Sequence, residues 1–130
     1  MEEPTEKRKM GIATFERRRY PRFLLDLPIE YQRAESSIPQ GGMAANASRS
    51  GLLVYLPEPV EVGQHLQVKL FFTYGRELHT LHALSEVVWV NTYFGKEGDY
   101  QCGLRFMETG ADDLRKLEEF LDQLARSQKL

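Results

Sequence analysis

Apolar and polar residues alternate along much of the middle of the chain. Leu27, Ile29 and Tyr31 alternate with Pro28, Glu30 and Gln32, and the same spacing recurs over residues 66–72 and 100–106. Successive side chains of a strand point to opposite faces, so a period of two predicts strands with one buried face. These three stretches are therefore expected to be half-buried strands.

Further segments between these stretches complete an all-β pattern. Residues 43–47 and 52–56 are expected to be short strands, and residues 78–90 a long one. Glycine, proline and small polar residues predict turns or loops between them, because these residues favour turn dihedrals or compete with regular structure. The expected loops are 36–42, 57–63, 74–77 and 94–99.

The hydrophobic period changes near the C-terminus. Apolar residues recur there at spacings of three and four, which predicts one face of a helix. Thr109 and Asp112 form a plausible N-terminal cap pair, and Asp112 with Lys116 a favourable pair at helical spacing. Strands followed by a single helix argue against parallel βαβ units and favour a small antiparallel barrel capped by a C-terminal helix. The apolar positions of the helix are Leu114, Leu117, Phe120, Leu121 and Leu124.

Length and composition indicate one small domain. The chain has 130 residues, 42% of them hydrophobic, and a formal net charge of −2. Residues 1–14 are polar and charged and are expected to form a flexible tail before a domain at 15–127. The N-terminus lacks the apolar core of a signal peptide, and no apolar stretch would span a bilayer, so a cytoplasmic protein is expected.

No constellation of residues indicates catalysis. His79 and His82 are three apart on an expected strand and so point to opposite faces, which prevents a shared metal. Cys102, the only cysteine, lies on an apolar face and is interpreted as a core residue. A nucleophile elbow, a dinucleotide fingerprint and a Walker loop are all missing from the sequence. The sequence therefore predicts no enzyme activity, no metal site and no cofactor.

Two polar elements stand out against this background. Arg17, Arg18, Arg19 and Arg22 lie within six residues of extended chain. Guanidinium groups bind phosphate and the O6/N7 edge of guanine, and their planes stack on bases. Taken alone, the run could equally be a solvated basic tail.

The second element is the segment Asn46-Ala47-Ser48-Arg49-Ser50-Gly51. Its composition predicts a tight turn between two strands, with an amide and a hydroxyl available to a base edge or a phosphate. Gly51 allows either a positive φ or a close backbone approach. By itself this segment could be an ordinary turn.

Together the two elements resemble the signature of the PilZ domain family, Arg-x-x-x-Arg followed by Asp/Asn-x-Ser-x-x-Gly. Arg18 and Arg22 match the first motif, and Asn46, Ser48 and Gly51 the second. Leu27-Pro28-Ile29, Val87-Val88-Trp89 and Gly103-Leu104-Arg105-Phe106 also fit, so the resemblance covers roughly residues 16–125.

The resemblance implies a six-stranded antiparallel β-barrel that binds cyclic di-GMP, a bacterial second messenger. It places Arg18 and Arg22 on phosphate and guanine, and Asn46, Ser48 and Gly51 on a guanine edge and the ligand backbone. Arg17 is expected to contact ligand as well. Trp89 is interpreted either as a residue packed near the ligand or as a core tryptophan.

The resulting hypothesis is a receptor whose N-terminal loop changes on binding and is read by a partner that the sequence does not name. An additional arginine, Arg17, suggests an intercalated pair of ligands, because it can cover an outer guanine and offset the doubled charge. Two alternatives remain: an interaction module of the same fold that ignores nucleotide, and a binder of single-stranded nucleic acid. The net charge of −2 argues against the second.

Overall fold

Six strands and one helix make up the part of the chain that the structure describes. The computed structural model describes residues 23–91 and 100–128. The elements are β1 (Phe23–Arg33), β2 (Gln40–Ser48), β3 (Gly51–Leu56), β4 (His65–Tyr74), β5 (Glu77–Asn91), β6 (Tyr100–Thr109) and α3 (Ala111–Gln128). No helix within these residues is long and apolar enough to cross a membrane.

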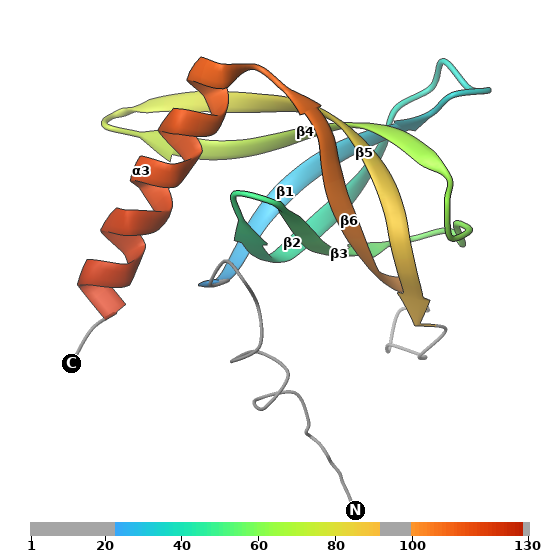
Figure 1. The fold of residues 1–130 in the computed structure, drawn as a ribbon, viewed down its shortest axis with the longest axis horizontal. Helices are drawn as coiled ribbons and strands as arrows, with labels where there is room; N and C mark the ends of the chain where they lie inside the picture. The colour runs from blue at the N-terminus through green and yellow to red at the C-terminus, as the bar shows by residue number, and fades with distance from the viewer. Residues whose placement is uncertain (1–22, 92–99, 129–130) are drawn as a thin grey trace, which may run out of the picture.

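The strands close into an antiparallel barrel. Their order around it is β1-β2-β3-β6-β5-β4, with β4 pairing back to β1. Figure 1 shows α3 standing across one end of the barrel, beside the projecting β4–β5 hairpin, while the β1–β2 loop lies at the opposite end. The six-stranded antiparallel barrel with a C-terminal helix, expected from the resemblance, is confirmed.

The inward-facing side chains of all six strands form the core. In β4, Leu66, Val68, Leu70 and Phe72 are buried, while the residues between them face outwards. Such regular alternation places these four apolar side chains on one face of the sheet, and their removal from water drives closure of the barrel. The buried partners from other strands include Ile29, Tyr31, Val54, Leu81, Val87, Cys102 and Leu104.

Helix α3 closes one end of this core with its apolar face. Leu117 and Leu121 are buried, and Phe120 packs on Phe72 with ring centroids 5.4 Å apart. Tyr74 donates a hydrogen bond of 2.6 Å to Glu119 across the same contact. The periodicity of the C-terminal segment therefore identified both the helix and its buried face correctly.

Several element boundaries differ from those expected. Strand β2 already begins at Gln40, within the expected loop 36–42. Strand β6 continues to Thr109, so Thr109 does not cap the helix; instead the Gly110 carbonyl accepts a hydrogen bond from the Leu114 N–H. The pair between Asp112 and Lys116 is present at 3.4 Å. The expected loop 94–99 and tail 1–14 lie outside the described residues.

Candidate functional site

The segment from Asn46 to Gly51 forms the hairpin between β2 and β3. Ser48 pairs with Gly51, which leaves Arg49 and Ser50 as a two-residue turn, as expected for a tight hairpin. The Ser48 hydroxyl accepts a hydrogen bond from the Ser50 N–H at 3.2 Å and lies 2.9 Å from the Ser50 hydroxyl. Ser48 is only 1% exposed. Its hydroxyl therefore stabilises the turn from within.

Gly51 is required for close packing rather than for an unusual dihedral. A Cβ at this position would lie 2.0 Å from the Leu104 carbonyl oxygen and 3.2 Å from the Arg105 Cα. Its φ is not in the left-handed region, which among the described glycines is occupied by Gly63 and Gly75. The sequence suggested two reasons for a glycine here, a positive φ or a close backbone approach. The positive φ is wrong; the close approach of β3 to the backbone of β6 is the reason.

A β-bulge directs Asn46 to the outside of the barrel. Ala44 pairs with Val54 and Asn46 with Leu53, so Ala45 is an extra residue in β2. Cross-strand partners share a face of the sheet. Val54 points into the core, and the bulge therefore places Asn46 beside Leu53 on the outer face, where uninterrupted alternation would have directed it inwards.

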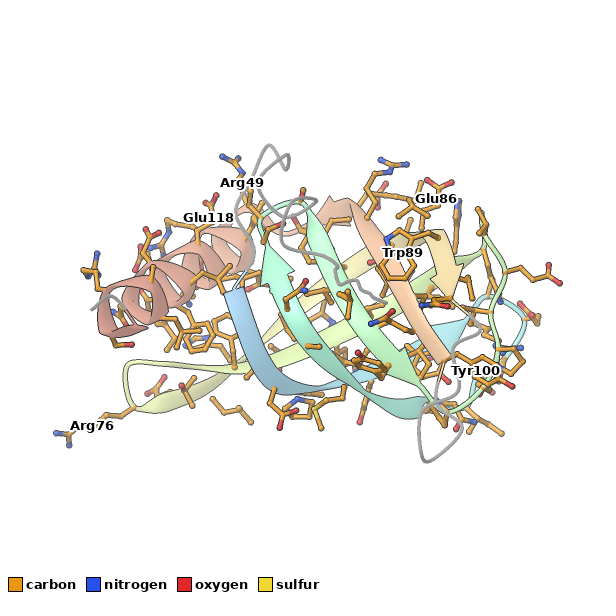
Figure 2. The ribbon with its side chains drawn as sticks, turned by 90° about the horizontal axis from the view of Figure 1, so that it is seen from below. Arg49, Arg76, Glu86, Trp89, Tyr100 and Glu118 are labelled. Atoms are coloured by element: carbon orange, nitrogen blue, oxygen red, sulfur yellow. The ribbon has the colours of Figure 1, made fainter. Side chains whose placement is uncertain are left out.

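A second bulge, in β5, directs Trp89 to the outside of the barrel. Val87 pairs with Leu104 and Trp89 with Gly103, so Val88 is the extra residue of β5. Trp89 is 38% exposed and is not part of the core, which rules out the interpretation of Trp89 as a core tryptophan. A Cβ on Gly103 would lie 2.2 Å from the indole Nε1, so the ring lies directly over this glycine. Figure 2 shows Trp89 on the outer surface of the barrel.

The two bulges place these side chains in one row across four strands. Asn46 pairs with Leu53, Leu53 with Gly103, and Gly103 with Trp89. Three strand spacings separate the ends of the row, which is about 14 Å. The row thus combines an amide at one end with an aromatic ring at the other, separated by a strip of apolar surface.

A neighbouring row adds a cation that sequence reasoning missed. Ser48 pairs with Gly51, Gly51 with Arg105, and Arg105 with Glu86. Arg105 and Glu86 form a short ion pair on the outer face. Arg105 follows Gly103-Leu104 in the strand that matches the family pattern, so its outward position in an alternating strand was the signal that could have identified it.

The chain reaches this surface from the N-terminal side. Phe23 pairs with Ala47 and Leu24 with Asn46, so β1 begins beside the second motif. Arg17, Arg18 and Arg22 all lie outside the described residues, and Arg22 directly precedes Phe23 in the sequence. The structure therefore places Asn46, Ser48, Gly51 and Trp89 on one wall of the barrel and gives no position for the three arginines.

Other titratable groups lie away from this surface. His79 packs edge-on against Tyr74, whereas His82 is exposed, so the two face opposite sides of β5 as expected. Burial raises the pKa of the Cys102 thiol from 9.0 to about 12, which keeps it protonated. Within residues 23–91 and 100–128, no group of three or more His, Cys, Asp or Glu side chains could hold a metal ion.

Comparison with known families agrees with this geometry. The model described as the PilZ domain matches residues 16–123, which is most of the chain. The chain belongs to the PilZ family. No curated protein matches the chain.

Solved structures share the PilZ fold at low sequence identity. The inhibitor of motility from Bacillus subtilis (MotI/DgrA) is 18% identical with a TM-score of 0.76, covering 88% of this chain and 54% of that one. YcgR from Escherichia coli in complex with c-di-GMP is 15% identical with a TM-score of 0.67, covering 85% and 47%. The isolated PilZ domain of YcgR with c-di-GMP is 14% identical with a TM-score of 0.63, covering 88% and 99%. This chain spans about half the length of the first two proteins.

Proposed function

We propose that this PilZ chain is a receptor for cyclic di-GMP and that the ligand lies on the outer face of β2, β3, β6 and β5. The observation that carries the proposal is the pairing of Phe23 with Ala47 and of Leu24 with Asn46. Through this pairing, the chain that follows Arg18 and Arg22 enters the barrel beside Asn46. The first motif ends at Arg22, 24 residues before Asn46, and in this proposal it lies beside the second motif.

Each residue then has a role that fits its position. Arg18 and Arg22 bind phosphate and guanine, and the Asn46 amide hydrogen-bonds to a guanine edge. Gly51 keeps β3 close to β6, so that the ligand backbone can approach the sheet. Ser48, buried and bonded to Ser50, acts through the geometry of the turn. It is therefore a positioning residue rather than a direct ligand contact.

Two residues on the outer strands extend the site. The exposed face of Trp89 offers a stacking surface for a guanine at the far end of the row. Arg105, held by Glu86 next to Gly51, adds a positive charge for a phosphate or a guanine edge. An aromatic ring and several guanidinium groups suit a ligand that contains both bases and phosphates.

The structurally related YcgR complexes, which contain c-di-GMP, support this ligand over the alternatives. The role is binding rather than turnover, and the messenger should be recovered intact after incubation with the protein. Binding would order the N-terminal loop around the ligand, and a partner protein would read that change. An interaction module that ignores nucleotide, or a binder of single-stranded nucleic acid, would lack this response.

Calorimetry with cyclic di-GMP tests the site assignment. Arg18→Ala and Arg22→Ala should each lose a charge-assisted contact worth about 1.5–3 kcal/mol, with an unchanged melting temperature. Arg76→Ala is the control, because Arg76 lies at the tip of the β4–β5 hairpin, away from Trp89 and Arg49 (Figure 2). Equal affinity of all three variants and the unmodified protein would refute the assignment. Binding of a single-stranded oligonucleotide in place of cyclic di-GMP would favour the nucleic-acid alternative.

The same titration tests the number of ligands. We propose an intercalated pair of cyclic di-GMP molecules per chain, with Arg17 against the outer guanine. Arg17→Leu should then shift the stoichiometry towards one, because leucine neither covers the guanine with a cationic plane nor offsets phosphate charge. Saturation of the unmodified protein at one ligand per chain would contradict this.

A further inference from the structure

One ion pair connects the hairpin of the proposed site with helix α3. Arg49 lies in the two-residue turn between Ser48 and Gly51, and its Nε is 3.1 Å from a Glu118 carboxylate oxygen. Figure 2 shows the two side chains close together, one from the hairpin and one from the helix. Among the ion pairs of the described residues, this is the one that joins α3 to a strand or turn of the barrel.

The two attachments of α3 to the barrel differ in kind. At the β4–β5 hairpin, Phe72 stacks on Phe120 and Tyr74 donates a hydrogen bond to Glu119. At the β2–β3 turn the contact is charged and open to solvent, with side chains 51% exposed for Arg49 and 37% for Glu118. Exposed ion pairs contribute little net stability and are weakened by salt, so a competing anion can replace the carboxylate.

We propose that Arg49 is a further ligand-binding residue and that Glu118 holds it until a phosphate of the ligand takes its place. The inference rests on the proposed function, because the competing anion is the phosphate of cyclic di-GMP bound at this hairpin. The Glu118 carboxylate lies at Nε of Arg49, so a phosphate that binds this edge of the guanidinium in two hydrogen bonds takes the place of the carboxylate. Ligand binding therefore breaks the contact between α3 and the turn, while the buried Leu117 and Leu121 and the packing of Phe120 keep the helix on the barrel.

Affinities of charge-removing variants for cyclic di-GMP test the competition. Glu118→Gln should bind about two- to fivefold more tightly at low salt, because Arg49 no longer has to leave a carboxylate. Arg49→Gln should bind more weakly, and Glu118→Gln added to Arg49→Gln should change nothing further. Asp122→Asn is the matched control, since it removes the same charge from an exposed position of the same helix. The gain with Glu118→Gln should shrink as salt is raised.

Hydrogen exchange of residues 111–128 tests the release. Saturating cyclic di-GMP should speed exchange in the unmodified protein by no more than about fivefold, because one exposed ion pair contributes little stability, and Glu118→Gln should show the same increase already without ligand. A purely structural ion pair would weaken binding in both single variants or in neither. Equal affinities of Glu118→Gln and Asp122→Asn, together with unchanged exchange, would overturn the inference while leaving the receptor assignment intact. An unmodified protein that binds no cyclic di-GMP would instead remove the receptor assignment itself, and this inference with it.

Discussion

Strand β4 differs from the bulged strands β2 and β5 in how buried and exposed side chains alternate. In β4, buried and solvent-facing positions alternate without interruption from His65 to Lys69 and beyond, and every buried side chain is apolar. In β2 and β5, a single extra residue, Ala45 or Val88, reverses the alternation part-way along the strand. After each reversal the outer face carries a residue of the proposed site, Asn46 or Trp89.

This difference separates stability from binding within one barrel. An uninterrupted strand such as β4 directs every second side chain inwards and contributes mainly to the core. A bulge costs regular pairing but redirects a chosen side chain, which explains why bulges occur next to functional sites. Substitutions should therefore act on stability alone in β4, and on ligand binding near the bulges.

The largest expected effect is on the core side of β4. Leu70→Ala should lower the free energy of unfolding by about 2–5 kcal/mol, because it leaves a cavity at a fully buried position. Urea unfolding gives this number directly. Lys69→Ala, one residue away but facing outwards, should change it by no more than about 0.5 kcal/mol. Below its melting temperature, Leu70→Ala should bind cyclic di-GMP as the unmodified protein does, and a specific loss of affinity would break the comparison.

Gly51→Val should lower both the stability and the ligand affinity, because Gly51 lies where the proposed site meets the barrel wall. The added Cβ meets a backbone carbonyl rather than a side chain, so β3 must move away from β6. Unfolding free energy should fall by about 1–3 kcal/mol, and affinity for cyclic di-GMP should fall with it. Gly41→Val in β2 is the control, since a Cβ there meets nothing within 4 Å. If the two variants melt alike, the close approach at Gly51 is not the constraint.

A smaller and mainly functional effect is expected from Gly103→Ala. A methyl group there would push the Trp89 ring off the sheet, and that ring is half-exposed and able to move. We expect about a tenfold loss of affinity for cyclic di-GMP from weakened stacking, within the range of about 1–3 kcal/mol per stacked base. The loss of stability should be smaller than for Gly51→Val. In a Trp89→Leu background Gly103→Ala should add no further loss of affinity, and an additive effect would argue that Trp89 does not stack on the ligand.

The last effect is absent at neutral pH, appears only in alkaline solution, and belongs to the inner face of β6. The native pKa of Cys102 is raised to about 12, so the unfolded chain loses the thiol proton first as pH increases. The contribution of the buried, protonated thiol to the free energy of unfolding is therefore complete below pH 9. It decreases between about pH 9 and 12, by about 1.4 kcal/mol per pH unit at most. Cys102→Ala should lack this component, and the difference in stability between the two proteins should vary with pH only above about 9. A thiol that reacts rapidly in the native state at pH 8 would contradict the burial.

Much of this architecture was predictable from hydrophobic spacing. Regular alternation identified β4 and most of β6, and the apolar face of α3 followed from Leu117, Leu121 and their neighbours. The bulges were not predictable, because an extra residue such as Ala45 or Val88 has no compositional signature. The position of Trp89 therefore stayed open between core and surface, and the partnership of Arg105 with Gly51 required the strand order.

The closed circuit of strands also limits how another protein could recognise this domain. Where β4 pairs back to β1, over residues 66–70, the barrel is closed and offers no edge onto which a foreign chain could add its own main-chain hydrogen bonds. Beyond Leu70 in β4 and before Ala83 in β5, the two strands of the β4–β5 hairpin pair only with each other, so the hairpin keeps open edges. Recognition of the closed wall must rely on side chains, and these differ between the ligand-facing wall and the acidic first turn of α3, which carries Asp112 and Asp113. The closure therefore confines any pairing of a foreign strand with β4 to the projecting hairpin.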